Sequence, residues 1–232
     1  MLSDYKEIIF GISEKKDGPM KLANNRGQAV ENRQNFFSQQ GIDNGKIVSA
    51  ALANGLEVKI VYQNDQGKMI GGVDALITNQ KDLILAITVA DCAPIYFYDP
   101  VKKVIALVHA GWRGVLGNII AKTISVMKDS FSSDSKDLQV FVGPHIRACH
   151  FEVKDDVAEM FVGYQKFVVY QKEKIFIDLK GIIQEQLLAG GVSNENIIFN
   201  PSCTYCEEKT YFSWRRDKPE IIEAMVAYLG LF

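Results

Sequence analysis

Short runs of hydrophobic residues separated by polar breaks fill the middle of the chain, as is typical of buried strands. Three such runs follow one another closely, are rich in β-branched residues and are bounded by turn-forming residues. They predict strands over residues 83–89, 95–98 and 104–109. The same pattern predicts further strands over 7–12, 58–62 and 138–142.

Other stretches repeat their hydrophobic residues at helical spacing. They predict helices over 28–40, 115–128, 153–162 and 179–188. A polar loop that extends through Asn25 precedes the first helix, which should turn Val30, Phe36 and Phe37 toward the core. The segment 221–231 suits either a helix or a core strand. Helices mixed with adjacent strands predict an α+β fold, and without repeats or linkers we expect one domain over 1–232.

Composition narrows the classes of function. With 26 basic and 28 acidic residues the net charge is −2, which does not favour binding to nucleic acid or to acidic membranes. The N-terminal stretch has no long apolar run of a signal peptide, and no uncharged apolar run reaches the roughly 18 residues of a membrane span. Four cysteines without a secretory signal predict reduced thiols in the cytoplasm.

Cys92 and His109 are the strongest candidates for chemistry. Cys92 precedes one predicted strand and His109 ends the next, so adjacent strands could deliver both side chains to one sheet edge. A thiolate beside an imidazole is either part of a zinc site or a nucleophile with its base. The alternative is a buried, inert cysteine, although a histidine is an unusual end for an apolar strand. No third zinc ligand is evident.

Glycines at 111, 114 and 117 separate the strand of His109 from the following helix. This turn could bind a phosphate or carboxylate with the help of Arg113, while Trp112 projects into the site. The alternative is a plain strand-to-helix turn, with Arg113 in a structural ion pair.

The remaining cysteines and histidines give weaker signals. His145 follows a predicted strand and lies on a loop. Cys149 and His150 are adjacent, and neighbours on an extended segment face opposite ways, so we do not expect them to bind one metal together. Cys203 and Cys206 could form a zinc knuckle with Cys149 and His150 as partners, but one such cysteine pair is a weak signal. A thioredoxin-like redox role is not expected, because the pair precedes a polar run instead of opening a helix. The aromatic and basic run over 212–217 could orient a planar substrate or form a surface cluster.

Several blocks together resemble one family. TVADCAPIYFYDP, VHAGWRG, VGPHI, FEV, CTYC and FSWRRD occur in the order seen in the YfiH-type or laccase-domain family, and VDALITN and AVENRQNF extend the resemblance over nearly the whole chain. The family was labelled polyphenol oxidase and is described as zinc-containing purine nucleoside phosphorylases. The resemblance implies a mixed sheet flanked by helices, akin to toxin-type cysteine hydrolases. It also implies phosphorolysis of adenosine, inosine and methylthioadenosine, with some adenosine deamination. Copper chemistry would need many imidazoles, and the chain has three.

The resemblance also implies site residues. Cys92 and His109 match two of the family's three zinc ligands, whereas Asn54 stands where the third, a histidine, is expected. A neutral carboxamide is a weaker zinc ligand, so zinc binding should suffer unless His145 substitutes. The family's N-terminal arginine is also missing from the segment 12–18. The other residues expected at the substrate are Asp74, Asp91, Trp112, Arg113, Gly114 and Arg215. Of these, Asp74 and Asp91 are expected to orient the imidazole or the ribose.

Two alternatives to the zinc phosphorylase stay open at this point. One is a metal-free hydrolase or deamidase with Cys92 as nucleophile, His109 as base and Asn54 orienting the imidazole. The other is a non-catalytic relative that retains the pocket for binding a small molecule.

Overall fold

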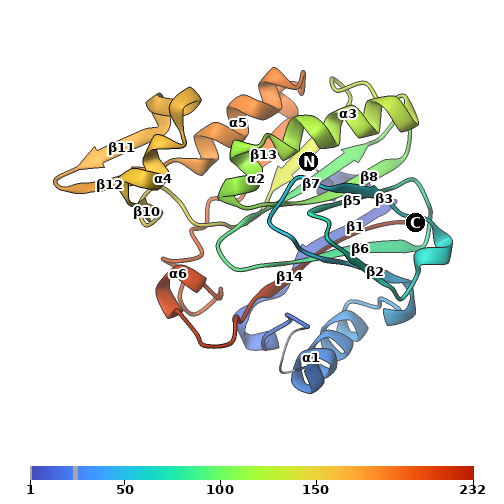
Figure 1. The fold of residues 1–232 in the computed structure, drawn as a ribbon. Coiled ribbons are helices and arrows are strands. Elements are labelled where there is room, and N and C mark those ends of the chain that lie inside the picture. Colours follow the sequence, from blue (N-terminus) through green and yellow to red (C-terminus); the bar gives the residue numbers. More distant parts are fainter. Residues whose placement is uncertain (1, 23–25) are drawn as a thin grey trace.

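The computed structural model of the protein describes residues 2–22 and 26–232, and the end of the loop predicted through Asn25 lies outside these residues. Two large sheets lie face to face and helices cover their outer faces (Figure 1). The helices are α1 (Arg26–Gln39), α2 (Trp112–Leu116), α3 (Ile119–Phe131), α4 (Asp155–Glu159), α5 (Leu179–Ala189) and α6 (Trp214–Asp217).

Both large sheets are mixed. The five-stranded sheet has the order β1 (Ile8–Ile12), β14 (Met225–Leu231), β6 (Leu83–Val89), β2 (Ile47–Ala51) and β4 (Met69–Gly71). The six-stranded sheet has the order β13 (Ile197–Phe199), β9 (Gln139–Val142), β7 (Ala93–Asp99), β8 (Val104–Ala110), β5 (Ala75–Thr78) and β3 (Val58–Ile60). A small sheet of β10 (Glu152–Val153), β12 (Lys174–Ile177) and β11 (Val168–Gln171) lies at one side (Figure 1).

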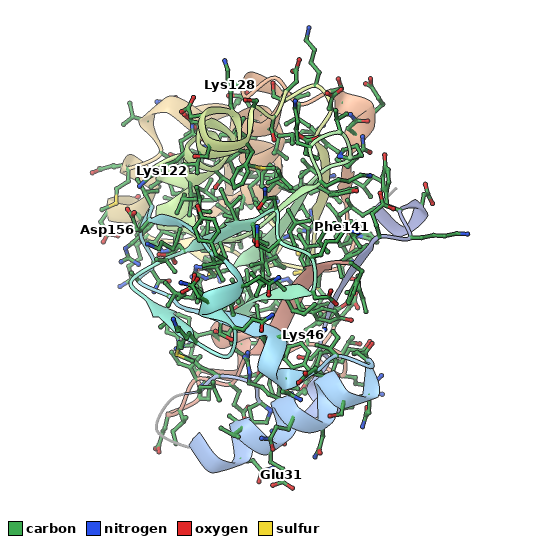
Figure 2. The ribbon with its side chains drawn as sticks, turned by 90° about the vertical axis from the view of Figure 1, so that its right-hand side faces the viewer. Glu31, Lys46, Lys122, Lys128, Phe141 and Asp156 are labelled. Carbon is green, nitrogen blue, oxygen red and sulfur yellow. The ribbon has the colours of Figure 1, made fainter. Side chains whose placement is uncertain are left out.

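The core is divided into layers by the alternation of side chains along each strand. In β8, Ile105 and Leu107 pack between the two sheets, whereas Ala106 and Val108 pack toward α3 and α5. On the far side, Phe36 and Phe37 of α1 cover the outer face of the five-stranded sheet. Glu31 on α1 and Lys128 on α3 mark the two outer layers at opposite ends of Figure 2. By the same alternation, His109 shares the face of Ile105 and Leu107 and points between the sheets.

The predicted α+β class is confirmed, and the predicted strand over 83–89 coincides with β6. The ambiguous C-terminal segment contains a strand, β14, which lies inside its sheet and pairs with β1 on one side and β6 on the other. No helix among the described residues is long and apolar enough to cross a membrane.

Two helix predictions need correction. The helix predicted over 115–128 is two helices, because Asn118 takes the left-handed conformation (φ 58°) and caps the second one. The helix predicted over 153–162 is only the short α4 followed by a 3-10 turn. In α1, Val30 is 38% exposed rather than buried, since the buried stripe runs through Ala29, Arg33 and Phe37.

Candidate active site

Cys92, His109 and Asn54 surround one point at the ends of β7 and β8. Ala93 pairs with Ala110 across these strands, so Cys92 and Gly111 lie just beyond the last pair. A Cβ atom placed on Gly111 would lie 3.1 Å from Cys92 Sγ, 3.5 Å from His109 Cε1 and 3.9 Å from Asn54 Oδ1. A side chain at position 111 would therefore occupy the space between these groups, which the glycine leaves open.

Asp74 orients the imidazole of His109. Its Oδ1 lies 2.9 Å from His109 Nδ1, and its two oxygens also accept hydrogen bonds from three consecutive backbone amides, at 2.8–3.3 Å: Ala53, Asn54 and Gly55. Because Nδ1 is engaged by the carboxylate, Nε2 is left for the hydrogen bond with the Cys92 side chain. In the hydrolase alternative Asn54 was expected in this orienting role; the structure places Asp74 there.

Cys92, His109 and Asp74 shift one another's ionisation. Burial lowers the pKa of His109, but the adjacent Cys92 and the hydrogen bond to Asp74 outweigh burial and raise that pKa to about 9. Burial raises the pKa of Asp74, but hydrogen bonds from His109 and the backbone lower it overall. At neutral pH we therefore expect an imidazolium held against a carboxylate.

Asn54 occupies the place where the resemblance expects the third zinc ligand. Its backbone is left-handed (φ 56°), and its backbone N–H donates a hydrogen bond to Asp74 Oδ1 at 3.0 Å. The donors that meet here are one sulfur, one imidazole nitrogen and one carboxamide oxygen. This set lacks the third strong donor that catalytic zinc sites have, so we derive no catalytic step through a metal at this point.

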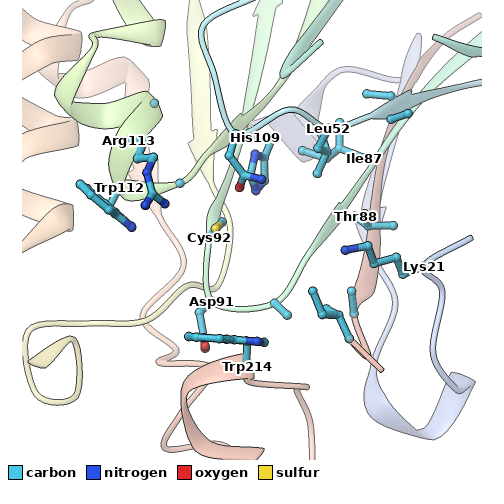
Figure 3. Close-up of a pocket in the computed structure, with 18 of the residues that line it drawn as sticks. Lys21, Leu52, Ile87, Thr88, Asp91, Cys92, His109, Trp112, Arg113 and Trp214 are labelled. Atoms are coloured by element: carbon cyan, nitrogen blue, oxygen red, sulfur yellow. The ribbon is translucent and has the colours of Figure 1, made fainter. Parts of the chain in front are cut away.

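The three residues open into a cavity of about 510 Å³ between the sheets and the helical ends. Trp112 and Arg113 lie together on one side and Lys21 and Thr88 on the other, with Cys92 between them (Figure 3). Trp214, which also lines the cavity, lies below Asp91 in the same view. Of the residues predicted at the substrate, those that line this cavity are Asn54, Asp91, Trp112, Arg113, Gly114 and Arg215.

Arg33 is a cavity residue that the sequence did not single out. Its side chain is 8% exposed and donates hydrogen bonds to neutral groups, Ser49 Oγ at 2.7 Å and the Met20 carbonyl at 3.4 Å. Within the described residues no carboxylate forms an ion pair with it. Burial lowers its pKa to about 10, so it stays charged at neutral pH. A basic residue within the buried stripe of α1 was the signal that could have revealed it.

Asp91 connects the cavity to the C-terminal loops. Its two oxygens accept hydrogen bonds from Thr204 Oγ1 at 2.6 Å and from the Arg215 amide at 2.7 Å. This contact fixes the start of α6, and with it Trp214 and Arg215, against the cavity. Arg113 stacks on Trp112 with its guanidinium 4.2 Å from the ring centroid and forms no ion pair among the described residues.

His145 lies apart from this group. It is buried, its Nδ1 contacts the Gly143 carbonyl at 2.8 Å, and it does not line the cavity. In the described part of the chain, His145, Cys92 and His109 do not lie close enough together to bind one metal ion. The geometry therefore gives no support to His145 as a substitute zinc ligand.

A second group of cysteine and histidine side chains lies elsewhere and can hold a metal ion. One ligand atom from each of four residues lies within 4.8 Å of all the others: Cys149, His150, Cys203 and Cys206. We expected Cys149 and His150 to face opposite ways, which is wrong. They lie in a tight turn, closed by hydrogen bonds from the His150 and Phe151 amides to the Arg147 carbonyl, and not on an extended segment.

Comparison with known proteins places the chain in a family. The profile described as multi-copper polyphenol oxidoreductase laccase matches residues 14–229. The chain belongs to this family. It is 30% identical to purine nucleoside phosphorylase YlmD of Geobacillus stearothermophilus, over 97% of this chain and 91% of that protein. It is 29% identical to adenosine deaminase RL5 of an unknown prokaryotic organism, over 82% of this chain and 77% of that protein.

A solved structure supports the same assignment. The crystal structure of Bacillus licheniformis hypothetical protein YfiH superposes with a TM-score of 0.94 at 25% identity, covering 100% of this chain and 96% of that chain. The family predicted from the sequence blocks and the mixed-sheet architecture are therefore both confirmed.

Proposed function

We propose that this protein is a purine nucleoside phosphorylase, which converts a purine nucleoside and phosphate to the free base and ribose 1-phosphate. The observation that carries the proposal is the cavity itself, which Cys92 and His109 line together with the buried Arg33. Asp74 holds the His109 ring, and among the described residues no carboxylate forms an ion pair with Arg33. Relatives that carry this activity in their names support it.

The cavity suits a phosphate anion. Four cationic side chains line it: Lys21, Arg33, Arg113 and Arg215. The acidic lining residue Asp91 already accepts hydrogen bonds from Thr204 and from the Arg215 backbone amide. Among these cations, Arg33 is buried, and its hydrogen bonds within the described residues go to neutral groups, so an incoming phosphate would supply a counter-charge.

The reaction can be assigned to named groups. A phosphate oxygen attacks C1′ of the ribose, and the bond to the purine nitrogen breaks with its electron pair leaving on the base. The departing purine takes a proton, which the His109 imidazolium can supply because its pKa is raised to about 9. Asp74 keeps the ring in place during this transfer. Trp112 and Trp214, which line the cavity, are suited to stack on the flat base.

The oxidase label of the family does not suit this chain. Multicopper sites require many imidazoles, and the three histidines lie in three separate places: beside Cys92, in a buried contact with Gly143, and among the cysteines of the second group.

The direct test follows hypoxanthine and ribose 1-phosphate release from inosine, with and without phosphate. We expect phosphate-dependent release, which Arg33→Gln reduces mainly through a higher KM for phosphate, by about 10- to 100-fold. Arg33→Lys is the matched control and should recover part of the loss. Base release that is independent of phosphate would contradict the phosphorylase and favour the hydrolase.

Adenosine deamination is a second candidate because one relative is named adenosine deaminase RL5. In this reaction water replaces the amino group of the base, so inosine forms from adenosine without phosphate. Chromatography of parallel reactions that start from adenosine separates inosine, the product of deamination, from adenine, the product of phosphorolysis. Inosine formation that disappears in Cys92→Ser would assign both reactions to one cavity.

The remaining predictions accompany this proposal. They are a cytoplasmic location, one domain over 1–232, and no nucleic-acid or membrane partner.

A further inference from the structure

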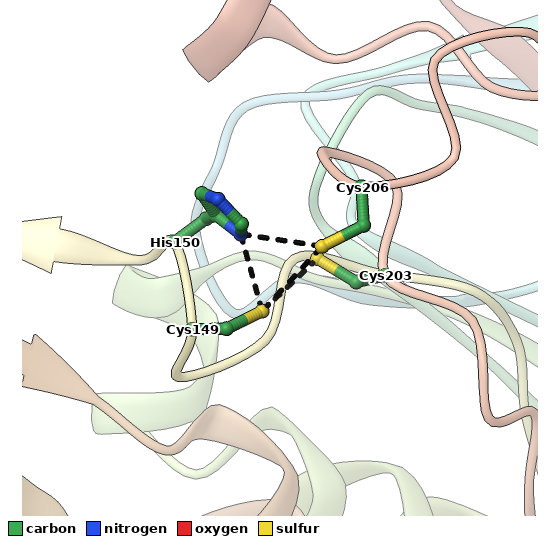
Figure 4. Close-up of side chains that lie close together, drawn as sticks. All are labelled: Cys149, His150, Cys203 and Cys206. Carbon is green, nitrogen blue, oxygen red and sulfur yellow. Dashed lines mark hydrogen bonds between the residues drawn. The ribbon is translucent and has the colours of Figure 1, made fainter.

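A surface group of three cysteines and one histidine joins two segments that are far apart in the chain. Cys149 and His150 lie in the turn before β10, and Cys203 and Cys206 lie in the loop between β13 and α6. Figure 4 shows the four side chains converging from the two loops. We call this set the Cys3His cluster. It shares no residue with the Cys92 and His109 group.

The spacing of the ligand atoms matches a tetrahedral metal site. Cys149 Sγ lies 3.7 Å from Cys203 Sγ and 3.8 Å from Cys206 Sγ. Four ligands around zinc with Zn–S bonds of about 2.3 Å place their sulfurs about 3.8 Å apart. His150 Nδ1 lies 3.2 Å from Cys149 Sγ and 3.3 Å from Cys206 Sγ, close to the edge of the same tetrahedron.

A disulfide does not explain this arrangement. Bonded sulfurs lie about 2.0 Å apart, and Cys149 is nearly equidistant from two partners, with no preference for either. The imidazole of His150 also points its nitrogen at the sulfurs. Its ring is stacked on Tyr205, with centroids 4.0 Å apart and planes 13° apart, which fixes its orientation.

The surroundings of Cys203 are those of a metal thiolate. Its sulfur is buried and interacts with backbone amides from both loops, at Arg147, Tyr205 and Cys206. Such amides stabilise negative charge on sulfur. Cys149 and Cys206 are exposed, so a metal would reach the site from solvent.

We propose that the Cys3His cluster binds one structural Zn²⁺ that fastens the turn 147–150 to the loop 201–206. Four protein ligands of sulfur and nitrogen close the coordination sphere, which is the pattern of structural zinc sites and leaves no open position for substrate.

The Cys3His cluster is connected to the candidate active site through hydrogen bonds of neighbouring loop residues. Thr204, between the two cysteines, donates to Asp91, the residue before Cys92. Arg216 of α6 donates to the carbonyls of Thr204 and Tyr205 at 2.9 and 2.8 Å. Zinc at the cluster therefore positions Asp91 and α6, and it acts on the cavity without touching the substrate.

Metal content tests the proposal without reference to activity. Zinc is measured by mass spectrometry in wild-type protein, Cys206→Ser and Cys92→Ser, all purified untagged in reductant. We expect the cluster variant to lose about one zinc per chain and Cys92→Ser to retain that equivalent. Equal zinc in wild-type protein and Cys206→Ser, or an intact mass that shows a cluster disulfide, would overturn the proposal.

Histidine variants and cobalt cover the case in which a cysteine variant does not fold. His150→Cys should keep the metal as a four-thiolate site, whereas His150→Ala should lose it to a chelator. Wild-type protein loaded with Co²⁺ should develop thiolate-to-cobalt charge-transfer absorption and the intense visible bands of tetrahedral cobalt. Their absence in folded protein, or their loss in Cys92→Ser alone, rejects the cluster as the site.

Hydrogen exchange tests the connection to the cavity. Removal of zinc by a chelator should speed exchange of the backbone amides over 201–217, including the Arg215 amide held by Asp91, and leave β6 and β14 unchanged. Unchanged exchange over 201–217 after complete zinc loss would rule out the structural role.

Discussion

The chain contains two groups of cysteine and histidine that differ in what surrounds them. The Cys92 and His109 group has one thiol and one imidazole, a buried carboxylate on the second ring nitrogen, and an open side facing the cavity. The Cys3His cluster has four ligand atoms, three sulfurs and one imidazole nitrogen, which all lie within 4.8 Å of one another. A surface pocket runs past Cys149 and His150, but these ligand atoms face each other. The first arrangement leaves room for a substrate and raises the pKa of His109, whereas the second offers four ligands that complete the coordination sphere of a metal. The same two residue types therefore serve chemistry in one place and architecture in the other.

Replacing one cysteine from each group breaks this comparison most sharply. Cys92→Ser should lower kcat/KM for phosphorolysis by about 10³-fold or more, because it removes the thiol that helps raise the pKa of the proton donor His109, and leave the thermal midpoint nearly unchanged. Cys206→Ser should lower the thermal midpoint and reduce kcat/KM far less. Steady-state kinetics with thermal unfolding on the same preparations checks both. Equal kinetic losses in the two variants would argue against separate roles.

The carboxylate is the next difference to test. Asp74→Asn should lower kcat by about 10- to 100-fold, since the amide cannot hold the charged imidazole as the carboxylate does. Asp99→Asn is a matched control. Asp99 is also buried and also accepts hydrogen bonds from backbone amides, those of Val101 and Lys102, but it does not contact His109. The pH profile of kcat should change in Asp74→Asn only; a similar change in both variants would point to a general loss of folding.

Asn54→His should make the two groups more alike. Histidine tolerates the left-handed backbone of Asn54 better than most residues, and it would add a third strong donor beside Cys92 and His109. In a Cys206→Ser background, which lacks the cluster metal, we expect zinc to rise by about one equivalent per chain. No gain in zinc would show that the three side chains do not converge closely enough to bind a metal.

The smallest effect concerns His145, which belongs to neither group. Burial lowers its pKa to about 3, so below the ordinary value of 6.5 the unfolded chain binds a proton that the folded chain excludes. Its contribution to stability is complete above pH 6.5 and is lost as the pH falls toward 3. His145→Asn should flatten this acid limb when the free energy of unfolding is measured against pH. An unchanged limb would assign acid sensitivity to other groups.

The central strands were predictable because both of their faces are buried, which leaves continuous apolar runs such as 83–89. Other strands were missed. Of these, β4 has no buried residue and β11 is no more than half-buried. The inner strands β2 and β5 were also missed: they are buried, but they have only five and four residues. The break between α2 and α3 depends on the left-handed Asn118, which helical spacing alone does not reveal.

The candidate site was predicted in the same uneven way. Cys92, His109 and Asn54 could be chosen from the sequence because strand ends and family blocks placed them together. Arg33 was missed because its charge lies on the buried stripe of a helix, where apolar residues are expected. The Cys3His cluster was dismissed because Cys149 and His150 were treated as extended neighbours, and only the turn brings them to one side.

The most direct test of the division between the two groups combines two readings on one preparation of Cys92→Ser. Ribose 1-phosphate formed from inosine and phosphate is measured together with zinc per chain. We expect ribose 1-phosphate formation to fall by about 10³-fold or more while the cluster zinc, about one per chain, is retained. Retained phosphorolysis, or complete loss of zinc along with activity, would contradict it.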